Sequence, residues 1–152
     1  MNNVVITVGA PGSGKSTWVE NYKLSHPNMT FLSSDALRAV FGKDENDQTV
    51  SARVFEHMEN EVDRLLSEGK DVCIDATNMH RRARRVWIDL AKKHDAIITA
   101  YVFIVNRNIL IERNQKRGDM GGRNVPIDVI DRMLTNYVEP TKREGINKIH
   151  FV

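Results

Sequence analysis

Apolar residues along the chain fall into short continuous runs that alternate with longer stretches of helical spacing. Short β-branched runs such as Val4–Val8 are typical of strands that are buried on both faces of a parallel sheet. The pattern predicts five strands, at Val4–Val8, Met29–Ser33, Asp71–Asp75, Ile97–Val105 and Lys148–Val152. Between the strands it predicts helices, over about Lys15–Ser25, Asp35–Phe41, Val50–Leu66, His80–His94, Arg107–Arg117 and Pro126–Tyr137. This alternation predicts an α/β fold with a roughly five-stranded parallel sheet and helices on both faces.

Length and composition predict one domain that spans residues 1–152. The chain is 41% hydrophobic and 28% charged, which is typical of a globular protein, and 152 residues are the size of one ordinary domain. No apolar run approaches the roughly eighteen residues of a membrane span, and the first residues lack the features of a signal peptide. The single cysteine, Cys73, lies in an apolar run and is interpreted as a buried packing residue. We therefore expect a cytoplasmic protein without a membrane partner.

The net charge of +2 conceals two segments of opposite sign. From Asp44 to Asp71 the chain has nine acidic residues and three basic ones. From His80 to Arg123 it has eleven basic residues and four acidic ones. An anionic substrate is expected to bind at the second segment.

Residues 9–16, with the sequence GAPGSGKS, match the phosphate-binding motif G-x-x-x-x-G-K-[ST] in full. The motif lies between a predicted buried strand and the start of a helix, where backbone N–H groups and the helix dipole favour phosphate. Lys15 is expected to reach the β- and γ-phosphates of a nucleotide, and the Ser16 hydroxyl is suited to Mg²⁺. The alternative is a glycine-rich turn with an accidental lysine. The candidate nucleotide-binding residues are Gly9, Gly12, Ser13, Gly14, Lys15, Ser16 and Thr17.

Two aspartates follow predicted strands and are expected at the same edge of the sheet as the phosphate-binding loop. Asp75 ends an apolar strand, where a carboxylate can support the metal. The alternative role, capping the turn that follows, is compatible with this one. Asp35 can accept the proton of an attacking hydroxyl, and Arg38, three residues later on the same helical face, can bind a phosphate of the acceptor. By helix propensity alone, Asp35 would instead be an N-cap and Arg38 a solvated residue.

The chain resembles the polynucleotide 5′-hydroxyl kinases of phage and bacterial end-repair systems over almost its whole length. The resemblance is carried by GAPGSGKSTW at 9–18, SSDALR at 33–38, DENDQTV at 44–50, DATN at 75–78, RNQKRG at 113–118 and VPIDVI at 125–130. The phosphate-binding loop is common to many families. The acidic loop at 44–50 and its order relative to SSDALR are much more specific.

The resemblance implies a role for each matching residue. Lys15 and Ser16 would serve the phosphates of ATP and Mg²⁺, and Asp75 would support the metal. Asp35 would be the general base for a 5′-hydroxyl, and Arg38 would contact a phosphate of the acceptor. Arg113 and Arg117 would neutralise charge on the transferred phosphoryl group, Arg117 also binding the nucleotide, and Gln48 would line the acceptor pocket.

Residues 113–125 are predicted to form a mobile lid that carries these arginines. Arg113 and Arg117 are four residues apart on a predicted helix, so both face one side. Gly118, Gly121 and Gly122 are expected to provide a hinge for closure. Arg123 can be a third contact of the lid or a solvated residue.

Four arginines at the start of the helix at 80–94 have no assigned role: Arg81, Arg82, Arg84 and Arg85. They oppose the helix dipole, so local stability does not explain them. They can contact a nucleic-acid backbone, form a solvated face, or pair with the acidic long helix. His57, His80 and His94 lack metal-site spacing and are interpreted as surface or packing residues, and Trp18 and Trp87 as packing residues.

These features predict ATP-dependent phosphorylation of the 5′-hydroxyl end of DNA or RNA. The sequence has no D-x-D-x-T phosphatase motif, so we expect no removal of 3′-phosphates. The alternatives are a kinase of a nucleoside, sugar or antibiotic and, from a non-enzymatic class, a nucleotide-dependent binding module. The sequence leaves open the choice of DNA or RNA, the strandedness of the substrate, and whether the protein is a homo-oligomer.

Overall fold

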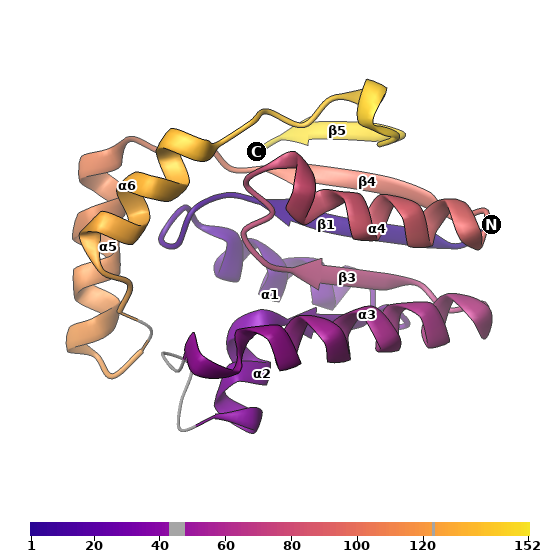
Figure 1. Ribbon diagram of the computed structural model, residues 1–152, viewed down its shortest axis with the longest axis horizontal. Coiled ribbons are helices and arrows are strands. Elements are labelled where there is room, and N and C mark those ends of the chain that lie inside the picture. Colours follow the sequence, from indigo (N-terminus) through magenta and orange to yellow (C-terminus); the bar gives the residue numbers. More distant parts are fainter. Residues whose placement is uncertain (43–47, 123) are drawn as a thin grey trace.

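The strands form one parallel sheet in the computed structural model, which describes residues 1–42, 48–122 and 124–152 (Figure 1). The strands are β1 (Asn3–Val8), β2 (Thr30–Ser33), β3 (Val72–Asp75), β4 (Ile97–Val102) and β5 (Lys148–Phe151). Their order across the sheet is β2-β3-β1-β4-β5, and each neighbouring pair is parallel. The predicted five-stranded parallel sheet is confirmed.

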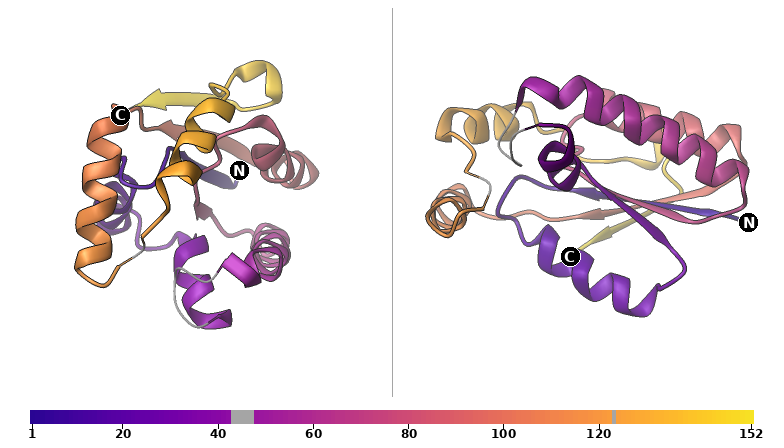
Figure 2. Two further views of the ribbon diagram at one scale, coloured as in Figure 1. Left: turned by 60° about the vertical axis from the view of Figure 1, so that its left-hand side comes forward. Right: turned by 90° about the horizontal axis from the view of Figure 1, so that it is seen from below.

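Helices cover both faces of this sheet, and two more stand at the end where the strands finish. The helices are α1 (Lys15–Ser25), α2 (Ser34–Phe41), α3 (Ser51–Ser67), α4 (Arg81–Lys93), α5 (Arg107–Asp119) and α6 (Ile127–Asn136), with 3₁₀ turns η1 (Gln48–Val50) and η2 (Lys142–Glu144). Figure 2 shows α1 on one face, α3 and α4 on the opposite face, and α5 and α6 beyond the carboxyl ends of the strands. None of the helices in the described ranges is long and apolar enough to cross a membrane.

The strand order places a crevice between the carboxyl ends of β1 and β3. These strands are neighbours, but the chain leaves β1 through α1 on one face and leaves β3 through α4 on the other. Connections that diverge to opposite faces leave a crevice between the two strand ends, where α/β proteins bind their ligands. The fold therefore positions a site above β1 and β3.

The main core lies between the sheet and the helices α3 and α4. Long apolar residues of α3 recur at helical spacing, and alternate residues of β1 face them because a strand has a period of two. Buried residues of this cluster include Val4, Ile6, Val8, Val54, Met58, Val62, Ile74 and Trp87. Cys73 is also buried, as predicted.

Most boundaries differ from the prediction by a residue or two, and two of the differences bear on the site. The strand predicted at Ile97–Val105 ends at Val102, because the next residues turn toward Asn106, which caps α5 with its side chain. Phe103 instead packs beside the phosphate-binding loop. It lies so close that a Cβ built on Gly9 would be 3.0 Å from the Phe103 Cβ. The helix predicted from Asp35 begins at Ser34, and the N-cap is the Ser33 hydroxyl, which accepts a hydrogen bond from the Ala36 N–H. Asp35 is therefore not the cap.

Candidate active site

The phosphate-binding loop connects β1 to α1 at the crevice. Gly12 and Gly14 have φ values of 85° and 100°, in the left-handed region that side chains other than glycine rarely adopt. Gly14 precedes the helix and has no side chain to cap it, so the first N–H groups of α1 face the loop without a side-chain acceptor from that position. The Lys15 ammonium donates a hydrogen bond to the Gly9 carbonyl and so lies across the loop. A loop of this geometry is suited to bind phosphate.

Asp75 lies at the carboxyl end of β3 beside Ser33 of β2, which is its partner in the parallel register. Both residues line the same cavity as Lys15. Burial raises the pKa of the Asp75 carboxyl, while the positive charge of Lys15 opposes that rise. Asp75 and Ser16 offer carboxylate and hydroxyl oxygens, which are the ligand types that Mg²⁺ prefers.

Asp35 and Arg38 form an ion pair on the first turns of α2. Arg38 Nη1 lies 2.8 Å from Asp35 Oδ1, and the Arg38 side chain is only 7% exposed. Arg38 Nε also donates to the Ser51 hydroxyl oxygen at 3.4 Å. The predicted placement of both residues on one helical face is therefore found in the structure.

Arg113 and Arg117 reach the same site from α5. Arg113 Nη1 donates to the Gly12 carbonyl at 3.1 Å, which ties the helix to the phosphate-binding loop. Arg117 Nη2 lies 3.9 Å from Asp35 Oδ2. The structure therefore places two arginines, one at the phosphate-binding loop and one at the carboxylate, along one side of α5.

Asn114, next to Arg113 in α5, fixes the chain that leaves the helix. The buried Asn114 side chain accepts a hydrogen bond from the Val125 N–H at 3.1 Å and donates one to the Val125 carbonyl at 2.6 Å. The α5 helix is further linked to α6 by the ion pair between Arg107 and Asp131. The bonds of Asn114 hold Val125, at the end of the segment predicted as a lid, against the helix.

The structure places Gly118, one of the predicted hinge glycines, inside a helix. Gly118 lies within α5, which continues to Asp119, and a Cβ at this position would meet Asn124 Cβ at 2.8 Å. Glycine is needed here because the returning chain passes too close for a side chain. Gly121, with a φ of 84° and open space around it, is the residue at which the chain reverses.

These elements enclose a cavity of about 830 Å³, within the range of ligand-binding pockets. The phosphate-binding loop, β2, α2, the end of β3 and α5 all contribute to its wall. Four of the five predicted catalytic residues line it: Lys15, Asp35, Arg113 and Arg117. The fifth, Arg38, does not line the cavity but pairs with Asp35, which does. Ser16, Thr17 and Asp75 also line it. The sequence therefore predicted the main parts of one contiguous site.

Two lysines of the cavity were missed from the sequence. Lys116 lines the cavity between Arg113 and Arg117, and Lys23 lies two turns of α1 beyond Lys15, with its ammonium 5.4 Å from the centre of the Phe31 ring. The helical spacing of these residues from Arg113 and from Lys15 is the signal that could have found them. They add two positive charges to the lining of the cavity.

A second cavity of about 320 Å³ adjoins the outer side of the phosphate-binding loop. Its polar edge is formed by Gly14, Thr17 and Asn21, and its apolar walls by Trp18 and by residues 103–105. The Trp18 ring packs against Tyr101, with 4.4 Å between the ring centroids, as its predicted packing role requires. Trp18 also lines the second cavity. The cavity offers a flat apolar surface next to the start of α1.

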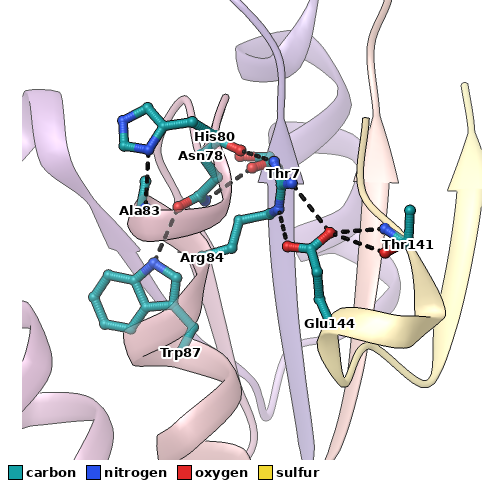
Figure 3. A network of polar contacts seen from close by, with 8 residues as sticks. All are labelled: Thr7, Asn78, His80, Ala83, Arg84, Trp87, Thr141 and Glu144. Carbon is teal, nitrogen blue, oxygen red and sulfur yellow. Dashed lines mark hydrogen bonds and ion pairs between the residues drawn. The ribbon is translucent and has the colours of Figure 1, made fainter. Parts of the chain in front are cut away.

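The four arginines at the start of α4 separate into two groups. Arg84 is fully buried and pairs with Glu144, so neither solvent, nor the acidic long helix, nor a nucleic-acid backbone is its partner (Figure 3). Arg81, Arg82 and Arg85 are exposed. His80 caps α4 by accepting the Ala83 N–H, and His94 pairs with Asp63 at 2.6 Å, which are the surface and packing roles predicted for them.

Two predicted positions lie outside the described residues. Arg123, and the acidic part of the loop at 43–47, are not described. The backbone of Gln48 belongs to η1, but its side chain is likewise outside the description, so its predicted place in the acceptor pocket stays a prediction.

Comparison with known proteins identifies the family. Residues 4–140 match a family described as an AAA domain. The chain belongs to this AAA domain family. It is 29% identical, over 97% of its length, to a protein named transcription factor bHLH140 from Arabidopsis thaliana, of which it covers 16%. It is 28% identical, over 98% of its length, to a putative bifunctional polynucleotide phosphatase/kinase from Acanthamoeba polyphaga mimivirus, of which it covers 32%.

The chain is also similar to a protein of known structure. The chain superposes on a protein of the Pnkp1/Rnl/Hen1 RNA repair complex with a TM-score of 0.77 and 29% identity, covering 89% of this chain and 43% of that one. The chain therefore spans less than half the length of these relatives. This AAA domain has the α/β fold of P-loop kinases, and the resemblance to polynucleotide kinases predicted from the sequence is confirmed. Its fold implies that it binds a nucleotide.

Proposed function

We propose that this AAA domain transfers the γ-phosphoryl group of ATP to the 5′-hydroxyl end of a DNA or RNA strand. The observation that carries the proposal is the placement of Asp35 in one cavity with the phosphate-binding loop. Asp35 can accept the proton of an attacking hydroxyl. Arg38 and Arg117 beside it can bind the phosphates of the strand that carries this hydroxyl. The likeness to the viral polynucleotide phosphatase/kinase and to the RNA repair complex supports the same substrate class.

The residues divide the reaction among them. Lys15 and the N–H groups at the start of α1 would hold the donor phosphates, while Arg113 and Arg117 would bind the charge that spreads over the transferred group. Asp35 would accept the proton of the 5′-hydroxyl while the hydroxyl oxygen attacks the γ-phosphorus in line with the leaving ADP. Arg38 would leave its pair with Asp35 to bind a phosphate of the acceptor strand.

Ser16 and Asp75 are the residues that would hold Mg²⁺. Among the described residues, no cluster of three or more His, Cys, Asp and Glu side chains could hold a metal ion alone. The fit is therefore to an ion that takes most of its ligands from phosphate and water, as Mg²⁺ does in kinases. When bound, the ion supplies neutralisation of the β- and γ-phosphate charges.

Labelling of 5′ ends tests the proposed function. Incubation with γ-labelled ATP, Mg²⁺ and oligonucleotides should label DNA or RNA that ends in a 5′-hydroxyl. The same oligonucleotides with a 5′-phosphate are the control and should stay unlabelled, and a 3′-phosphate should be retained. Absence of label on every oligonucleotide, together with transfer to a nucleoside or a sugar, would replace the proposal with a small-molecule kinase.

We further propose that the second cavity holds the donor nucleoside, because its apolar walls adjoin the loop at Gly14 and Thr17. Replacing Ile104 with Glu should raise the KM for ATP about tenfold while changing kcat and the oligonucleotide KM little, since only donor binding loses apolar contact. Ile104 is 64% exposed, so the change should not unfold the protein. Ile127→Glu, at an exposed position on α6 that lines neither cavity, is the matched control. Equal KM values for ATP in both variants would place the nucleoside elsewhere.

A further inference from the structure

All three nitrogen atoms of the Arg84 guanidinium donate hydrogen bonds within the protein. The side chain is fully buried, and its Nε and Nη2 atoms donate to the two carboxylate oxygens of Glu144 at 2.9 and 3.1 Å. Its Nη1 atom donates to the backbone carbonyl of Asn78 at 2.9 Å (Figure 3). One residue thereby joins α4, the loop that follows β3, and the 3₁₀ turn η2.

Asn78 links the loop that follows β3 to β1. Its backbone is left-handed, with a φ of 46°, and its side chain donates to the Thr7 carbonyl at 2.9 Å. The Trp87 indole N–H donates to the Asn78 side-chain oxygen at 3.0 Å, which fixes the orientation of the amide. The Thr7 hydroxyl in turn donates to the Ala76 carbonyl at 2.9 Å.

The loop that is held in this way contacts the first residue of the phosphate-binding loop. The Gly9 N–H donates to the carbonyl of Thr77 at 2.9 Å. Asp75 immediately precedes Ala76, so the same bonds restrain the carboxylate end of β3. The position of Asp75 relative to the phosphate-binding loop is thus set by bonds on both sides of Thr77.

Glu144 adds the segment that follows α6. Its Oε2 atom accepts the N–H of Thr141 at 2.8 Å, and the Met79 carbonyl accepts the N–H of Val138 at 2.8 Å. Burial by itself would raise the pKa of Glu144, but the hydrogen bonds from Arg84 and Thr141 hold it below its ordinary value. The chain that leaves α6 is therefore anchored to the same loop as the phosphate-binding residues.

Stability alone does not require this arrangement. A buried ion pair loses the hydration of both charges, and apolar residues of similar volume often stabilise a fold as well or better. What an apolar pair does not provide is the fixed fork that binds Glu144 and the Asn78 carbonyl at once. The distinctive contribution of Arg84 is therefore geometric.

We propose that Arg84 is a positioning residue for phosphoryl transfer. It acts through Asn78 and Glu144 on the loop that follows Asp75 and contacts the phosphate-binding loop. The inference rests on the proposed function, because the site that it positions is the proposed transfer site. It predicts that geometry and stability can be separated by mutation.

Two variants make this separation. Arg84→Lys keeps the charge but cannot form the fork and the bond to Asn78 together. The double variant Arg84→Met with Glu144→Leu removes both charges and is expected to keep a melting temperature at or above that of the wild type. In both variants we expect kcat to fall about 10- to 100-fold, as for a small misplacement of reacting groups. The KM for the oligonucleotide should change little, and hydrogen exchange of the Gly9 amide should become faster because its acceptor is no longer fixed.

The control is Val62→Ala, which weakens the core under α3 without touching these bonds. Well below its melting temperature it should keep the wild-type kcat and the wild-type exchange at Gly9. Wild-type kcat, or wild-type exchange at Gly9, in both Arg84 variants would overturn the proposal. If the wild type labels no polynucleotide, the proposed function fails separately, and Gly9 exchange together with the dissociation constant for ATP still decides whether Arg84 positions the loop.

Discussion

Replacement of Asp35 by Asn should lower the rate of 5′-end phosphorylation by about 10²- to 10⁴-fold, the usual contribution of a general base. The amide cannot accept the proton of the attacking hydroxyl, although its oxygen can still accept a hydrogen bond from Arg38. Because Asp35 lies across the cavity from the phosphate-binding loop, the affinity for ATP should change only a few-fold. Single-turnover labelling of a 5′-hydroxyl oligonucleotide and equilibrium binding of ATP measure the two effects.

Glu20→Gln is the matched control for this variant. Glu20 is a carboxylate in the wall of the same cavity, but it belongs to α1 and pairs with Lys23 at 3.4 Å. Its loss should leave the transfer rate within a few-fold of the wild type. A transfer rate for Asp35→Asn as high as that of Glu20→Gln would remove Asp35 from the chemistry and leave it as a partner of Arg38.

Replacement of Arg117 by Ala should have the second large effect, a loss of about 10³-fold or more in kcat, as for arginines that stabilise the transition state of phosphoryl transfer. Arg117 lies on the side of α5 that faces the cavity, with Nη2 3.9 Å from Asp35 Oδ2. Arg117→Lys should recover only part of the rate, because a single ammonium cannot form the two-pronged contact of a guanidinium. Steady-state kcat and KM with varied ATP and varied oligonucleotide measure the loss.

Arg132→Ala controls for the removal of an arginine near the lid. Arg132 is exposed on α6, where it pairs with Asp128 at 3.4 Å, and it does not line the cavity. Surface pairs of this kind contribute little to stability, so kcat should be unchanged. A loss at Arg117 that appears in the KM for ATP alone would contradict a role in the transition state.

The candidate site was predictable from the sequence where its chemistry is local. The eight-residue phosphate-binding motif contains its own turn, so its conformation follows from its glycines and its place after a strand. Asp35 and Arg38 are three residues apart on one helix, so their contact needs only helical geometry. Asp75 could be placed because parallel strands end at the same edge of a sheet.

Other residues could not be assigned because their surroundings come from distant parts of the chain. Arg84 lies between the exposed Arg82 and Arg85 in the sequence, yet it is buried and pairs with Glu144, sixty residues away. The cluster of glycines at Gly118, Gly121 and Gly122 predicts a hinge, but Gly118 lies inside α5 where Asn124 packs against it. The spacing of Arg84 from Trp87 and Ile88 places it on the buried face of α4, but no local pattern indicates its partner Glu144. Likewise, no local pattern indicates the approach of Asn124 to Gly118.

The sequence by itself determined the order of strands and helices, the phosphate-binding loop, and the acidic and basic residues that follow the strands, because each depends on hydrophobic periodicity or on residues within a few positions of one another. Only the tertiary structure decided how these parts meet. It brought α5 to the phosphate-binding loop so that Arg113 and Arg117 line one cavity. It also buried an ion pair that joins α4, the loop after β3 and the chain after α6. The physical reason is that burial and ion pairing depend on which distant segments pack together, and a linear pattern of residue types does not specify that.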